Sequence, residues 1–70
     1  MMPILVADRG EEQIVRKVGG SPDVKRHLEN LGIVPGGMVT LINVTDGNVI
    51  IKVKESRIAL NKEMAMKIMV

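Results

Sequence analysis

The strongest structural signal in the sequence is the segment 38–54. Two runs rich in β-branched and other apolar residues, 38–44 (MVTLINV) and 48–54 (NVIIKVK), flank the tripeptide 45–47 (TDG). Asp-Gly between two such runs is typical of a tight antiparallel hairpin. The sequence therefore predicts a β-hairpin here, and a β-sheet as the basis of the fold.

Alternation along the two runs separates them into faces. The odd-numbered face is predicted to form the core and contains Val39, Leu41, Asn43, Val49, Ile51 and Val53. A second apolar row on the opposite face contains Met38, Ile42, Val44 and Ile50. This second row has two interpretations: the helix covers it, or it is an interface for another protein.

A single helix is predicted to begin just before the hairpin. Ser21 is a suitable N-cap, and Pro22 suits the first helical position, where no backbone N–H is needed. Apolar residues at 24, 28 and 31 form one stripe, and Gly32 suits the left-handed residue that ends a helix. Residues 34–37 (VPGG) fit a type II turn that leads into the hairpin.

The rest of the chain predicts short strands. These are 13–18, 57–60 and 67–70, with one helical turn capped by Asn61 between the last two, and with Ile68 and Val70 pointing inward. About five strands and one inserted helix predict a mainly β fold, a small and partly open barrel, as one domain over residues 1–70. At this length the core leaves a small stability margin, so a homodimer or a partner would help.

The amino-acid composition excludes several kinds of site and partner. The chain has no Cys, Phe, Tyr or Trp, and its formal charge is +2 with the basic residues spread along the sequence. Thiolate metal sites and disulfides are excluded, and base stacking on aromatic rings is unavailable, so we expect no nucleic acid partner. The apolar start is too short for a signal peptide and nothing approaches a membrane span, so we expect a soluble chain, and the absence of Cys is compatible with a cytoplasmic location.

No group of residues predicts catalysis, a metal site or a cofactor. His27, the only histidine, has Asp23 and Asn30 one turn away and is interpreted as a helix-flank residue. The methionines at 64, 66 and 69 are interpreted as core filling rather than a soft-metal site. We expect neither catalytic nor metal-binding residues, and we do not expect an enzyme.

Two stretches carry a family resemblance. The first is Leu31-Gly32-Ile33 followed by Pro35-Gly36, and the second is the C-terminal run 57–70 (RIALNKEMAMKIMV). With these, the chain resembles the FeoA family over nearly its whole length. The resemblance implies an SH3-like β-barrel with an inserted helix. It also implies an accessory role in bacterial ferrous iron transport, with the cytoplasmic GTP-binding domain of the membrane transporter FeoB as partner.

Leu31, Ile33 and Pro35, at the helix end and the following turn, are the predicted partner-binding residues. This chain differs from many relatives in having fewer arginines in the helix and VKESR (53–57) in place of a glycine-bearing turn. The membrane would be reached only through the partner. The resemblance does not distinguish effects on GTP hydrolysis, nucleotide release or transporter assembly.

Two other functions stay open. Related SH3-like domains are attached to the helix-turn-helix domain of metal-dependent regulators, so the chain could be a module of that kind. A small barrel that binds RNA through basic loops is the third interpretation, and it predicts salt-sensitive oligonucleotide binding.

Overall fold

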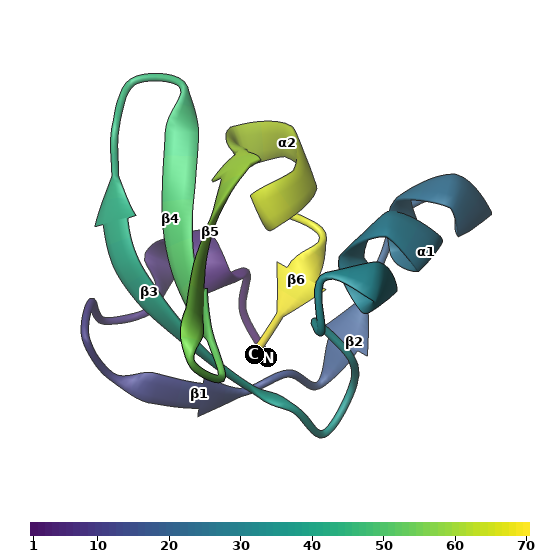
Figure 1. Ribbon diagram of the computed structural model, residues 1–70, viewed down its shortest axis with the longest axis horizontal. Helices are drawn as coiled ribbons and strands as arrows, with labels where there is room; N and C mark the ends of the chain where they lie inside the picture. Colours follow the sequence, from purple (N-terminus) through teal and green to yellow (C-terminus); the bar gives the residue numbers. More distant parts are fainter.

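A four-stranded antiparallel sheet dominates the computed structural model, which describes all residues 1–70 (Figure 1). Its strands, in the spatial order β1-β3-β4-β5, are β1 (Glu12–Ile14), β3 (Met38–Val44), β4 (Asn48–Val53) and β5 (Ser56–Asn61). A second sheet pairs β2 (Lys17–Val18) with β6 (Ile68–Met69). The two sheets form the small barrel-like fold that the sequence predicts, with six strands rather than about five.

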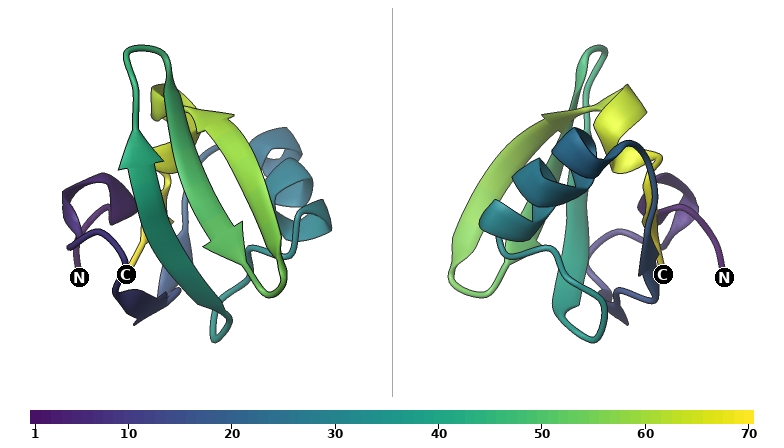
Figure 2. Two further views of the ribbon diagram at one scale, coloured as in Figure 1. Left: turned by 60° about the vertical axis from the view of Figure 1, so that its left-hand side comes forward. Right: turned by 90° about the vertical axis from the view of Figure 1, so that its right-hand side faces the viewer.

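The predicted helix is α1 (Pro22–Asn30), which lies behind the main sheet in the left view of Figure 2. The Ser21 side chain accepts a hydrogen bond from the backbone N–H of Val24, as an N-cap does. At the other end Gly32 has φ +92°, and the N–H of Ile33 donates to the carbonyl of Leu28 over 2.9 Å. This is a Schellman ending, and it confirms the predicted helix stop.

The reversal after the helix is also confirmed. The N–H of Gly37 donates to the carbonyl of Val34 over 2.9 Å, and Gly36 between them has φ +89°. These are the features of a type II turn, which requires a positive φ at its third residue. The same turn is anchored to the N-terminal half of the chain, because Val15 exchanges backbone hydrogen bonds with Gly36 and Gly37.

Two shorter helical segments close the ends of the barrel. A 3₁₀ turn, η1 (Ile4–Val6), buries Ile4 completely. The one-turn helix α2 (Lys62–Ala65) begins after Asn61, whose side-chain oxygen accepts from the N–H of Met64 over 2.7 Å. The two chain ends pair with each other, since Met2 and Val70 exchange backbone hydrogen bonds. None of the helices is long and apolar enough to cross a membrane.

The core is a single cluster of 14 buried residues, all of them apolar. Its members are Ile4, Ala7, Val15, Leu28, Ile33, Val39, Leu41, Val49, Ile51, Val53, Leu60, Ala65, Ile68 and Val70. The predicted inner face of the β3–β4 hairpin supplies five of these. Ile68 and Val70 point inward as predicted, so the C-terminal strand contributes to the core.

The predicted strand 13–18 is wrong as one continuous element. It pairs with β3 as far as Ile14 and with β6 from Lys17 onward, and between these strands the buried Val15 bonds to the turn before β3. The chain thus leaves one sheet for the other within two residues. The alternation of side chains could not reveal this change of sheet, because the backbone is extended both before and after it.

Asn43 is not on the core face, contrary to the prediction. A β-bulge between Leu41 and Asn43 adds one residue to β3, so that Asn43 pairs with Ile50 and Val44 with Val49. The extra residue exchanges the two faces of the strand beyond it. Val44 therefore packs against the core and Asn43 is exposed. The predicted second apolar row is divided, because Val44 leaves it while Met38 stays at the surface.

Core filling does not account for all of the C-terminal methionines. Met64 packs against the core, but Met66 has 49% of its surface exposed. Met69 is half-buried and lies opposite Lys17 across the second sheet.

Candidate functional site

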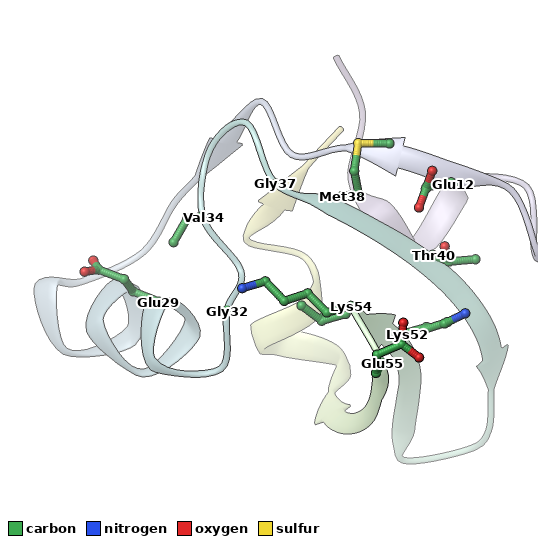
Figure 3. A pocket seen from close by; sticks show the side chains of 11 residues that line it. Glu12, Glu29, Gly32, Val34, Gly37, Met38, Thr40, Lys52, Lys54 and Glu55 are labelled. Atoms are coloured by element: carbon green, nitrogen blue, oxygen red, sulfur yellow. The ribbon is translucent and has the colours of Figure 1, made fainter.

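One groove of about 630 Å³ opens on the molecular surface. It lies between the C-terminal end of α1, the turn that follows, the start of β3 and the tight turn between β4 and β5 (Figure 3). Its lining residues are Glu12, Glu29, Gly32, Val34, Gly37, Met38, Thr40, Lys52, Val53, Lys54 and Glu55. Segments far apart in the sequence therefore meet at this one place.

Close packing at Gly32 sets one wall of the groove. A Cβ added at Gly32 would lie 3.3 Å from Cγ1 of Val53, closer than ordinary van der Waals contact. Glycine at residue 32 therefore lets the helix end approach β4 without displacing Val53, and it also provides the positive φ of the helix stop. The helix end and the β4–β5 turn are held as neighbours by that contact.

Five charged side chains line the groove. Glu12, Glu29 and Glu55 are acidic, and Lys52 and Lys54 are basic. The side-chain hydrogen bonds of the molecule lie elsewhere, so these groups keep their capacity to bond with a ligand. In Figure 3 Lys54 reaches toward Gly32, whereas Lys52 extends the other way.

Apolar side chains form the rim on the β3 side. Val34 and Met38 line the groove and are 36% and 39% exposed. Ile14, which is 47% exposed, lies directly opposite Met38 in the β1–β3 register. Residues opposite each other in an antiparallel pair point to the same face, so Ile14 and Met38 are adjacent on the surface.

The predicted partner-binding residues are not among those that line the groove, and they differ in accessibility. Pro35 is exposed, Leu31 is half-buried against the core, and Ile33 is 1% exposed. Their role in partner binding stays a prediction. The residues of this segment that line the groove are their neighbours Gly32, Val34 and Gly37.

Sequence reasoning did not single out the contribution of the β4–β5 turn. Val53 pairs with Ser56, so Lys54 and Glu55 form a two-residue turn, and Lys54 has φ +56°, the only positive φ at a non-glycine residue. The signal for this turn lies in the sequence VKESR, which lacks the glycine that many relatives have there. What the sequence could not show is that this turn faces the helix end.

The other residues considered from the sequence lie apart from the groove. His27 is exposed on α1, and no group of three or more His, Cys, Asp or Glu side chains is arranged to hold a metal ion.

Known proteins of similar sequence and fold were then compared with the chain. It is 40% identical over all 70 residues to the "Putative Fe(2+) transport protein A" of Methanocaldococcus jannaschii, and the match spans 85% of that protein. A crystal structure described as the iron uptake regulatory protein FeoA superposes with a TM-score of 0.88 at 26% identity, covering 99% of this chain and 93% of that one.

Fold similarity extends further than sequence similarity. The FeoA protein of Chlorobium tepidum superposes with a TM-score of 0.85 at 20% identity, over 97% of this chain and 67% of that chain. A manganese-dependent transcriptional repressor gives 0.83 at 14% identity, over 94% of this chain but 38% of the repressor. The family model described as the FeoA domain matches residues 2–70. With that match over nearly its whole length, the chain belongs to the FeoA family.

Proposed function

We propose that the protein is an accessory protein of a ferrous iron transport system and that it binds the cytoplasmic GTP-binding domain of a FeoB-type membrane transporter. The observation that carries the proposal is the 40% identity over the full chain to a protein named for Fe(2+) transport. It is a binding module rather than an enzyme, and it works in the cytoplasm, recruited to the membrane by its partner.

The surface supports a docking role at the groove. Exposed apolar groups at Val34, Met38 and Ile14 lie beside unpaired charged groups, a combination typical of the centre and rim of protein interfaces. The groove is bounded by a helix end and two turns that glycine and backbone hydrogen bonds hold in place. A preformed surface of this kind loses little conformational entropy on binding.

NMR titration of the labelled protein with the GTP-binding domain of the cognate transporter tests the proposal. We expect shift changes at groove residues, and we expect Met38→Asp to weaken the affinity about tenfold or more, as for a central contact. Val6→Asp is the matched control, because Val6 is 64% exposed and lies in η1, outside the groove. Absence of shift changes at high protein concentration contradicts direct binding to that domain.

The same titration can be followed by GTP hydrolysis and nucleotide release. A binding partner that acts on the nucleotide changes one of these rates in proportion to the bound fraction, whereas a partner that only assembles the transporter changes neither. Docking is compatible with either result. The two rates show whether docking acts on the nucleotide or only assembles the transporter.

The similarity to a manganese-dependent repressor favours a second candidate, an SH3-like module of a metal-dependent regulator. This alternative predicts that the chain binds the DNA-binding part of such a regulator. Binding of the transporter domain and not of the regulator, measured side by side by NMR, separates the two functions.

A further inference from the structure

The outer face of the β4–β5 hairpin carries an unfavourable pair of charges. Lys52 and Arg57 are directly opposite each other in the register, and both are exposed. Like charges directly opposite across two strands destabilise a sheet. The pair therefore lowers the stability of the free protein, and nothing in the fold of the hairpin requires it.

Neighbouring residues do not neutralise this pair. On its other side Lys52 lies opposite Thr40, and Glu12 follows only on β1, two strands and about 10 Å from Lys52. A third cation, Lys54, sits in the turn with φ +56°, and Glu55 beside it is the one carboxylate between residues 48 and 61. The hairpin end thus holds three cations against one anion.

Two of these cations also line the groove. Lys54 reaches toward the helix end near Gly32 and Lys52 extends the other way, while Val34 and Met38 line the part of the groove formed by the turn and the start of β3 (Figure 3). A ligand lying in the groove would therefore meet both apolar side chains and cations. We name Lys52, Lys54 and Arg57 the cationic patch.

We propose that the cationic patch receives an acidic segment of the partner protein, with carboxylates at Lys52, Lys54 and Arg57 and an apolar side chain against Met38. Bound carboxylates would relieve the repulsion between Lys52 and Arg57, so part of the stability lost in the free protein returns on binding. The identity of that partner rests on the proposed function, whereas the chemistry of the segment rests on the patch.

An acidic peptide fits this surface better than other polyanions. A continuous row of phosphates would set negative charges beside Glu12 and Glu29 in the same groove and be repelled there, whereas a peptide can place carboxylates at the cations and neutral residues beside the glutamates. The chain has no aromatic residue on which nucleic acid bases could stack. Three cations are also fewer than the clusters that typically recruit proteins to anionic lipid surfaces.

Two variants separate binding from stability. Lys52→Glu places an opposite charge across from Arg57, so we expect the melting temperature of the free protein to rise by about 2–5 °C while partner binding weakens. Lys52→Glu/Arg57→Glu reverses the charge at two of the three positions of the patch, and we expect at least a tenfold loss of affinity for the GTP-binding domain and a weaker salt dependence. Lys52→Arg should retain binding.

The matched control is Arg16→Glu/Lys17→Glu, which makes the same change of charge at and beside β2, on the other sheet. We expect it to leave the affinity within twofold of the unmodified protein. If both double variants weaken binding equally, net charge and not the patch is responsible, and the proposal is overturned.

A short peptide alternating glutamate and leucine serves as an independent probe. Shift changes centred on Lys52, Lys54 and Arg57 support the patch even if the GTP-binding domain does not bind, a result that would refute the proposed function alone. Lack of peptide binding, or tighter binding of oligouridylate or of phosphatidylglycerol vesicles, overturns the acidic segment as occupant. Normal binding of the GTP-binding domain by Lys52→Glu/Arg57→Glu overturns the proposal while leaving the proposed function intact.

Discussion

The β3–β4 and β4–β5 hairpins share a strand but are built differently. In the β3–β4 hairpin the facing pairs Val39–Val53 and Leu41–Ile51 are buried and apolar. In the β4–β5 hairpin the outer pair Lys52–Arg57 is like-charged, and the turn places a lysine at positive φ. Both hairpins contribute inner pairs to the core, as Val49–Leu60 does in the second, but only the second sets two like charges opposite each other on its outer face.

The largest expected effect breaks the packing of the first hairpin. Ile51 is fully buried, so Ile51→Ala should lower the free energy of unfolding by about 2–5 kcal/mol, through lost apolar transfer and the cavity left behind. Urea unfolding followed by circular dichroism measures the loss. Ile14→Ala, at an exposed site of the same sheet, should change it by less than about 0.5 kcal/mol. Equal losses at both sites would contradict the assignment of core and surface.

The second-largest effect is expected at the contact between Gly32 and Val53, which joins the hairpins to the end of α1. Gly32→Ala should destabilise by about 1–2 kcal/mol, because alanine is strained at φ +92° and its Cβ would press on Val53. Gly36→Ala is the matched variant, since Gly36 has φ +89° but open space around it. Thermal unfolding of both should show a larger loss at Gly32. Identical losses would mean that backbone strain alone accounts for the effect at Gly32, without the contact to Val53.

Relieving the backbone strain in the β4–β5 turn should raise, rather than lower, the free energy of unfolding. Lys54→Gly is expected to stabilise the free protein by about 1 kcal/mol, because glycine adopts φ +56° without a Cβ penalty. The same variant should weaken partner binding through loss of the cation. Lys54→Ala loses the cation but keeps the strain, so it should weaken binding without the gain in stability. A destabilised Lys54→Gly protein would show that the lysine side chain supports the turn.

The smallest effect adds a counter-charge beside Lys52. In a Glu12→Gln background, which removes the like charge opposite residue 40 on β1, Thr40→Glu places a carboxylate directly across from Lys52 and should stabilise the free protein by about 0.5 kcal/mol. Thr40→Gln provides the same shape without the charge, and the difference between the two in thermal unfolding isolates the electrostatic part. The difference should shrink in high salt. If it does not, repulsion at Lys52 is not what limits this hairpin.

Local signals predicted much of the fold. The helix from Pro22 to Asn30 was readable because its cap, its apolar stripe and its terminal glycine all act within a few residues. The same holds for the turn at 34–37 and for the caps at Ser21 and Asn61. Asn43 was misplaced because a bulge is a property of two paired strands, and one strand's alternation does not reveal it.

The candidate site was predictable only in part. The predicted partner-binding segment does lie along the groove, but the sequence did not indicate that Ile33 is buried while Val34 faces the groove. Leucine and isoleucine after a helix suggest both core and interface, and burial depends on what packs against them. The side of the groove that contains Lys52 and Lys54 is distant in the sequence and was not foreseen.

The sequence by itself determined the main helix and strands, the family resemblance, and the positions where a turn or helix end needs glycine or proline. These depend on backbone preferences within a few residues. Only the tertiary structure decided that the strand at 13–18 divides between two sheets, that Val44 rather than Asn43 turns inward, and that the helix end meets the β4–β5 turn. These outcomes depend on strand register and on contacts between distant segments. A local sequence pattern does not encode the energies of such contacts.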